Sequence, residues 1–235
     1  MRVATRVRLL FVQENRERTW RSIDMLPFTS EQFFGVFAAY NESVWPAQVL
    51  LHALAILALV LVALPRDRSG QAISAILALL WLWLALAYHL AFFASINPLA
   101  HVFAAVSATG ALLFAWQGVV LRRLNFRFTR SGRTLVGMAL VVFALVIYPA
   151  WSIHAGHGYP SMPTFGLPCP TTLFTIGLLA FLVLPYPRST LVVPVLWSLV
   201  GAQAAFLLDV PQDLGLLVAA AVGGYLFVRA SARTA

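Results

Sequence analysis

Seven predominantly apolar stretches, joined by short connections, fill most of the sequence after residue 43. A helix needs about 20 mostly apolar residues to cross the hydrocarbon core of a bilayer. The sequence therefore predicts an all-α fold, a polytopic membrane helix bundle with seven spans. These are Val44–Leu64, Ala72–Ser95, Leu99–Leu121, Thr134–Ile153, Thr171–Tyr186, Thr190–Leu208 and Gln212–Val228. The fifth is the shortest and lies near the lower limit for a span.

The composition supports this class and excludes several mechanisms. Hydrophobic residues make up 61% of the chain and charged residues 10%, against about 45–50% and about 25% in soluble domains. The sequence contains no lysine, which excludes Schiff-base chemistry on a lysine amine. One cysteine excludes an intrachain disulfide and a CxxC pair. No GxxxxGK[ST] motif is present, so ATP-driven transport by this chain alone is not expected.

The arginines predict the orientation. With seven spans, ten arginines fall on one side of the membrane, and none, counted from Met25, falls on the other. They are Arg66, Arg68, Arg122, Arg123, Arg127, Arg130, Arg133, Arg188, Arg229 and Arg233. Cytoplasmic loops are the ones enriched in arginine and lysine. We therefore expect a bacterial plasma (inner) membrane protein with residue 25 outside and a cytoplasmic tail at 229–235. The high pI then reflects topology, and no nucleic-acid partner is expected.

Two segments precede the transmembrane domain predicted for residues 44–228. Residues 1–24 are a basic arm, which is either flexible or an artefact of the chosen start site, since Met25 would also serve as a start. Residues 25–43 predict a short amphipathic helix lying in the outer interface. Thr29 and Gln32 have the spacing of a capping box. One helical face collects Phe33, Phe34, Phe37 and Tyr40. The alternative is an N-terminal extension of the first span.

The reactive side chains concentrate in the predicted outer half, which contains all five histidines and the only cysteine. Polar residues at membrane depth usually face the bundle interior and mark a site or pathway. The candidate binding residues are Gln48, His52, His89, His101, Glu42, Asp209 and Asp213. The candidate metal ligands are His52, His89, His154, His157 and Cys169.

His52 and His89 are expected at similar depth on adjacent helices, and Gln48 shares a face with His52. Two facing histidines can ligate a haem iron or copper. Alternatively, each histidine hydrogen-bonds a neighbouring helix and has only a structural role.

The outer loop from His154 to Pro170 contains four prolines and three glycines, which predicts a stiff, defined path. Cys169 is expected near the N-cap of the fifth helix, with Pro170 in its first turn. A helix N-terminus favours a thiolate, so Cys169 is either a soft-metal ligand or redox-active thiol, or a buried inert residue. Asp209 and Asp213 are expected either to cap the last helix or to attract a cation.

Several segments together resemble an uncharacterised family of bacterial multi-pass membrane proteins, catalogued as a domain of unknown function. They are Met25–Phe34, Tyr40–Pro46, Tyr88–Pro98, Tyr159–Thr172 and Ala205–Asp213. The resemblance covers about residues 25–228 and implies a start near Met25. Some members are automatically labelled permeases, but the resemblance implies no established activity.

The sequence thus predicts a protein that binds or transports a small solute or metal ion through an outer polar site, with the lipid bilayer as its surroundings. One alternative is a membrane-embedded haem or copper binder in electron transfer. Another is a structural or sensory partner without chemistry. An enzyme acting on lipid-like substrates has no motif in its favour. The sequence does not indicate an oligomeric state.

Overall fold

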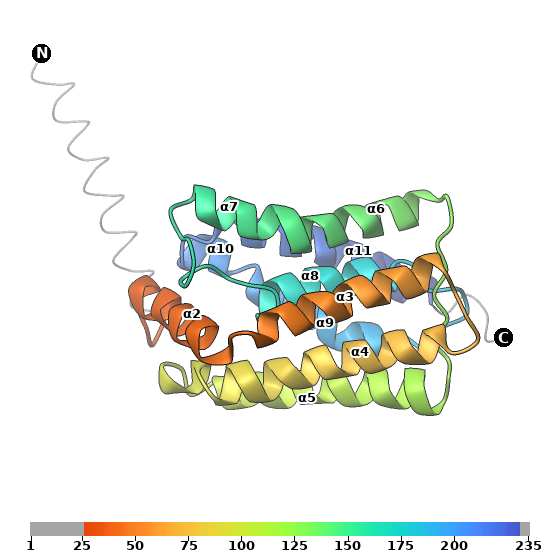
Figure 1. The fold of residues 1–235 in the computed structure, drawn as a ribbon, viewed down its shortest axis with the longest axis horizontal. Coiled ribbons are helices and arrows are strands. Elements are labelled where there is room, and N and C mark those ends of the chain that lie inside the picture. Colours follow the sequence, from red (N-terminus) through yellow and green to blue (C-terminus); the bar gives the residue numbers. More distant parts are fainter. Residues whose placement is uncertain (1–25, 231–235) are drawn as a thin grey trace, which may run out of the picture.

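The computed structural model describes residues 26–230. The predictions for the arm at 1–24 and for the tail beyond residue 230 lie outside the described residues. Figure 1 shows a bundle of helices with long axes that run in roughly the same direction. The α-helices are α2 (Ser30–Val44), α3 (Ala47–Ala63), α4 (Ser69–Trp83), α5 (Ala100–Phe114), α6 (Gly132–Val142), α7 (Tyr148–His154), α8 (Pro168–Leu179), α9 (Ser189–Gly201), α10 (Ala204–Leu207) and α11 (Gly215–Arg229).

Shorter π- and 3₁₀-helical segments lengthen several of these helices. The π-helices are η1 (Leu84–Leu90) after α4, η3 (Ala115–Val120) after α5 and η4 (Phe143–Ile147) between α6 and α7. The 3₁₀ turns are η2 (Phe93–Ser95) and η5 (Pro211–Leu214). The all-helical prediction is confirmed for the described residues, where only two isolated β-bridges interrupt the helical pattern.

Five helical segments are long and apolar enough to cross a membrane. They are Ser69–Ser95, Ala100–Val120, Gly132–His154, Ser189–Leu207 and Pro211–Arg229. A sixth is obtained if α2 and α3, which meet at an angle of 87°, are taken together as one broken span. Each of the seven predicted stretches contains a helix, but the structure supports five to six candidate spans rather than seven.

The fifth predicted span, Thr171–Tyr186, is the largest departure from the sequence prediction. Its helix is α8, which has 12 residues and ends at Leu179. It is about 18 Å long at 1.5 Å per residue, well short of a hydrocarbon core of about 30 Å. Every α8 residue except Cys169 is buried. The prediction that this stretch is a span-length helix is therefore wrong, because α8 is the central helix of the bundle.

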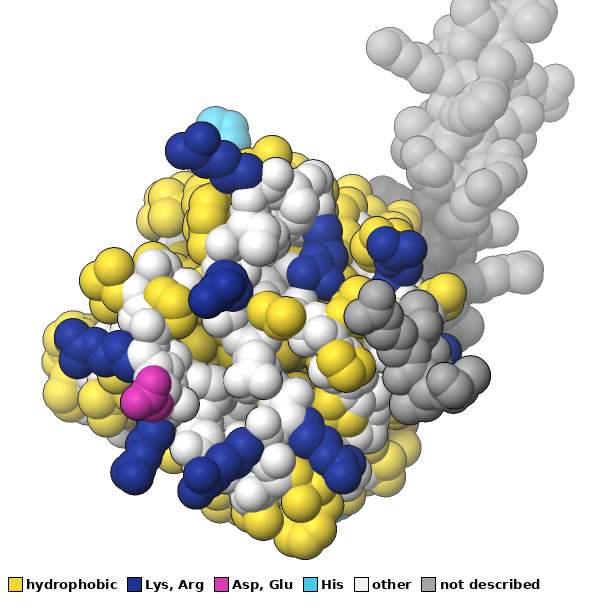
Figure 2. Space-filling model, turned by 90° about the vertical axis from the view of Figure 1, so that its right-hand side faces the viewer, with side chains coloured by type: hydrophobic (Ala, Val, Ile, Leu, Met, Phe, Trp, Pro, Cys, Tyr) yellow, Lys and Arg dark blue, Asp and Glu magenta, His cyan; other side chains and the backbone are white. Residues whose placement is uncertain are grey.

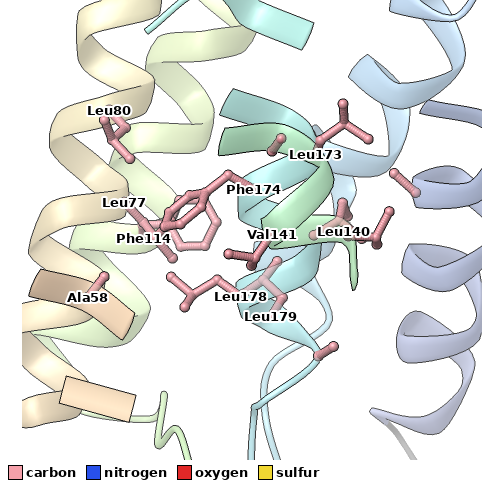
Figure 3. Packing of buried hydrophobic residues seen from close by; sticks show 14 of the residues in the cluster. Ala58, Leu77, Leu80, Phe114, Leu140, Val141, Leu173, Phe174, Leu178 and Leu179 are labelled. Atoms are coloured by element: carbon pink, nitrogen blue, oxygen red, sulfur yellow. The ribbon is translucent and has the colours of Figure 1, made fainter. Parts of the chain in front are cut away.

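Neighbours from both halves of the sequence enclose α8. It packs against α6, α9 and α11, and Trp81 of α4 donates through Nε1 to Thr175 Oγ1 at 3.2 Å. Figure 3 shows α8 side chains such as Phe174 and Leu178 among buried residues of α4, α5 and α6. The hydroxyl side chains of α8 are three small threonines, all buried, and the Thr175 hydroxyl donates to the Thr171 carbonyl. No side of the helix therefore carries a large polar or charged group, as expected for a fully enclosed position.

The described arginines lie at one end of the bundle, which we call the basic end. They occupy the α3–α4 and α5–α6 connections, the start of α6 and α9, and the end of α11, and Figure 2 shows them gathered on this face. The α5–α6 connection crosses the chain that leaves α8. The Arg127 amide donates to the Phe181 carbonyl at 2.9 Å, and the Arg133 guanidinium donates to the Leu182 carbonyl at 2.7 Å.

The opposite end, which we call the lid end, is covered by α2 (Figure 1). The predicted capping box is confirmed, because the Thr29 hydroxyl accepts from the Gln32 amide and the Gln32 side chain accepts from the Thr29 amide. The chain bends by 87° between α2 and α3, so an N-terminal extension of the first span would be the bent arm of a broken span; that alternative stays a prediction.

The aromatic face of α2 is buried, but the protein rather than lipid covers it. Its four aromatic residues pack with Tyr88, Phe93, Leu167 and Leu208 in one hydrophobic cluster. An amphipathic helix in the interface would bury this face among acyl chains. Here α2 is a lid on the end of the bundle, and its contact with a membrane interface remains a prediction.

Candidate ligand cavity

Asn41, at the end of α2, fixes the lid to the loop before α8. Its side chain is fully buried, and its Nδ2 donates to the carbonyls of Pro160 at 2.6 Å and Met162 at 2.8 Å. Its Oδ1 accepts from the Thr164 hydroxyl at 2.6 Å. Gln48 of α3 donates to the Asn41 carbonyl at 2.9 Å. Asn41 therefore joins the lid to the loop through its side-chain amide and to the next helix through its backbone carbonyl.

A second set of bonds places the start of α8. Trp83 Nε1 donates to the Tyr40 hydroxyl at 2.7 Å, and that hydroxyl donates to the Gly166 carbonyl at 3.2 Å. Gly166 has φ +102°, and a Cβ there would lie 2.5 Å from Leu51 Cδ1. Only glycine meets both conditions without strain. The next residues, Leu167 to Pro170, line a cavity.

The cavity lies beneath the lid and has a volume of about 260 Å³. Aromatic side chains from α2, η1, η2, α5 and α9 form much of its wall: Phe33, Phe37, Tyr88, Phe93, Phe103 and Trp197. His89 and Cys169 are also part of the wall. Mostly apolar pockets with a few convergent polar groups are typical of small-molecule sites.

His89 is the polar group that most distinguishes this cavity. The side chain is fully buried, and neither ring nitrogen has a hydrogen-bond partner. Its ring lies among aromatic neighbours, with centroids 5.0 Å from Trp197 and 5.8 Å from Phe103. Trp197 Nε1 is also buried without a hydrogen-bond partner of good geometry, although the Cys169 thiol lies near it. Leaving such groups unpaired costs about 1–3 kcal/mol each, so the cavity has unmet hydrogen-bonding capacity.

Three further polar side chains meet beside this wall. The Tyr148 hydroxyl donates to Asp213 Oδ1 at 2.5 Å, and the Cys169 thiol lies close to Tyr148, Asp213 and Trp197. Tyr148 and Cys169 line the cavity, and the carboxylate of Asp213 stands behind them. Asp213 is buried, so it does not form an outward-facing acidic pair with the exposed Asp209.

The remaining candidate residues lie elsewhere. His52 is half-buried, with Nδ1 2.8 Å from the Gln48 carbonyl and its ring against Phe165. Four other candidate residues have exposed side chains: Glu42, His101, His154 and Asp209. His157 stacks on Phe34, with ring centroids 3.8 Å apart.

The structure thus brings together His89, Cys169 and Asp213 from the predicted set. Cys169 is predicted near the N-cap of this helix; the N-cap is Leu167, and Cys169 follows Pro168 in the first turn of α8, together with Pro170. Within residues 26–230, no group of three or more histidine, cysteine or acidic side chains could hold a metal ion.

Sequence reasoning missed three residues of this region: Asn41, Tyr148 and Trp197. Tyr148 and Trp197 interrupt long apolar stretches with a polar group. Buried tyrosine and tryptophan usually find a hydrogen-bond partner. That expectation was a usable signal, although it could not show that Tyr148 and Trp197 share one cavity.

A comparison with protein families matches residues 30–235 to a family of unknown function, DUF6064. The chain belongs to DUF6064. This confirms the resemblance to a domain of unknown function and covers the lid, the cavity and the central helix. No curated protein and no solved structure matches the chain.

Proposed function

We propose that this DUF6064 protein is a multi-pass membrane protein that binds a small, mostly apolar molecule in the cavity beneath the lid. The observation that carries this proposal is the pair of buried, unpartnered groups in an aromatic wall, the imidazole of His89 and the indole Nε1 of Trp197. A bound molecule that hydrogen-bonds both groups offsets the cost of burying them unpaired.

The interior favours binding over passage through the bundle. Between the cavity and the basic end, the core contains the fully buried α8 side chains Leu173, Phe174, Leu178 and Leu179. A polar solute crossing here would lose its hydration without gaining partners. The part of the chain that the structure describes therefore supports a binding site at the lid end better than a permeation pathway.

Binding is tested on the full chain purified in mild detergent, with native mass spectrometry of the molecules that co-purify from the host membrane. We expect a bound species in the wild type and at least about a tenfold lower occupancy in His89→Phe, since about 1.4 kcal/mol of lost hydrogen bonding corresponds to tenfold. His101→Phe, at an exposed histidine, is the matched control. Equal occupancy in wild type and His89→Phe, or an empty wild type, contradicts the proposal.

A haem or copper centre for electron transfer is the second candidate, and the free ring nitrogens of His89 are the observation in its favour. It is weaker because His52, the other predicted ligand, packs against Phe165 while His89 packs against Trp197. The visible absorption spectrum and metal content of the same preparation distinguish the two: a haem band or stoichiometric metal that His89→Ala removes favours the centre.

We also propose seven crossings, with the basic end facing the cytoplasm of a bacterial inner membrane. The fifth crossing then consists of the loop before α8 together with α8 itself. The segregation of the described arginines supports this orientation. The native Cys169 lines the cavity, so its labelling would depend on access to the cavity as well as on the side of the membrane. The labelling experiments therefore use a Cys169→Ser background.

In that background we expect a membrane-impermeant thiol reagent added outside to label Glu42→Cys and to leave Asp67→Cys unlabelled until the membrane is permeabilised. Both positions are exposed, at opposite ends of the bundle. The reverse pattern means that the orientation is inverted. Labelling of both from outside contradicts an odd number of crossings between them.

A further inference from the structure

The cavity has an opening on the side of the bundle. Leu99 of the connection before α5 and Val200 of α9 both line the cavity, yet 56% and 42% of their surface is exposed. Gln203, between α9 and α10, also lines the cavity and is exposed. Three of the four exposed residues of the cavity wall thus lie at the start of α5 and the end of α9, and the fourth, Pro27, precedes α2. This distribution favours an opening between α5 and α9, where two apolar side chains would face lipid.

The cavity wall carries no arginine, aspartate or glutamate within residues 26–230. The described arginines lie at the basic end, at the other end of the helices. The closest buried acid is Asp213, behind Tyr148 and Cys169. An anionic group would thus enter without a counter-ion, which is unfavourable.

The unpartnered nitrogen atoms of His89 and Trp197 instead suit a ligand with an uncharged oxygen. Trp197 Nε1 is only a donor, whereas a neutral imidazole presents one donor and one acceptor. A hydroxyl group accepts from the indole while donating to His89. The space is small as well: about 260 Å³ is below the ~300–1,000 Å³ of drug-sized sites. A head group and the first part of a chain fill it, and a longer chain extends through the side opening.

We infer that the occupant is an uncharged amphiphile, a long-chain alcohol or a lipid with a comparable neutral head, that enters from the bilayer between α5 and α9. The neutral oxygen lies at His89 and Trp197, and the apolar chain leaves past Leu99 and Val200. This inference rests on the proposed function and adds the class of ligand and its route.

The test uses the full chain in phosphatidylcholine vesicles and three photoreactive probes. The probes share one long alkyl chain with a diazirine near the head and end in a hydroxyl, a carboxylate or a trimethylammonium group. After illumination, mass spectrometry maps the labelled residues. We expect the alcohol to label the cavity wall at least about tenfold more than either charged probe, because an unpaired buried charge is costly. His89→Phe combined with Trp197→Phe should remove that preference.

The route is tested with two tryptophan substitutions on the exposed surface of α9. Val200→Trp narrows the opening, and we expect it to slow labelling of the cavity wall by the alcohol severalfold. Leu199→Trp is the matched control, since Leu199 is 51% exposed and is not part of the cavity wall. The two variants should unfold at similar temperatures.

Each outcome has one meaning. If a charged probe labels the wall as well as the alcohol does, the neutral ligand class is wrong while cavity binding stands. If Val200→Trp labels as fast as Leu199→Trp, entry from the side is wrong and the lid becomes the route. If no probe labels the wall in the wild type and no molecule co-purifies, both this inference and the proposed function fail.

Discussion

Gly177→Val is expected to prevent stable folding, or to lower the free energy of unfolding by about 3 kcal/mol or more. Gly177 is on α8, where it crosses α6 at Gly137. A Cβ at Gly177 would lie 2.7 Å from the Gly137 carbonyl oxygen and 3.1 Å from the Val141 amide nitrogen. Both are backbone atoms, so no side-chain rotation relieves the clash, and α6 and α8 must separate. Such a loss is a large part of a total stability of about 5–15 kcal/mol.

Thermal unfolding and size-exclusion profiles of the purified full chain measure this effect. Gly224→Val on α11 is the matched control, because a Cβ at Gly224 meets no atom within 4 Å. Gly137→Val should resemble Gly177→Val, since its Cβ would lie 2.6 Å from the Gly177 carbonyl oxygen. If Gly177→Val and Gly224→Val unfold alike, the close α6–α8 crossing is not present in solution.

Asn41→Asp is expected to release the lid and to destabilise the protein by about 3–5 kcal/mol, the range for an uncompensated buried charge. The substitution keeps the shape of the side chain but replaces its only donor with an oxygen. That oxygen would face the carbonyls of Pro160 and Met162, to which Asn41 Nδ2 now donates at 2.6 and 2.8 Å. The interactions between α2 and the loop before α8 would become repulsive.

Hydrogen exchange of residues 30–44 and of the loop before α8 reports lid release directly, and thermal unfolding reports the overall loss. Glu42→Gln is the control, because Glu42 is the next residue on α2 and is exposed. We expect faster exchange in Asn41→Asp and unchanged exchange in Glu42→Gln. Protected amides in Asn41→Asp would show that the lid does not depend on Asn41.

The local features of this fold could be predicted because neighbouring residues determine them. The capping box of Thr29 and Gln32 was found from spacing alone and is present. The arginines could be assigned to one end of the bundle because the chain reverses direction at each short connection. In the structure the described arginines do lie at one end. Both features depend only on sequence distance and on the presence of helices.

The identity of each helix's partners could not be predicted in the same way. The hydropathy of a segment is the same whether lipid or protein covers it. The sequence of α8 therefore predicts a short span, although protein covers it. The aromatic face of α2 was assigned to the interface for the same reason, although Tyr88 and Leu208 cover it. Likewise, the sequence predicts His52 and His89 at similar depth on adjacent helices, but only His89 lines the cavity. Each outcome depends on contacts between distant segments.

The central position of α8 has a consequence for how a ribosome-bound chain can reach this state. At about 18 Å, α8 is too short to be threaded into a bilayer as an independent segment. Two of the helices that enclose it, α9 and α11, are synthesised after it. Until α9 and α11 are made, the earlier helices therefore cover α8 only in part. The bundle of the described residues is complete only when α9 and α11 close around α8, so we expect a chain truncated before α9 to leave the buried side chains of α8 unshielded.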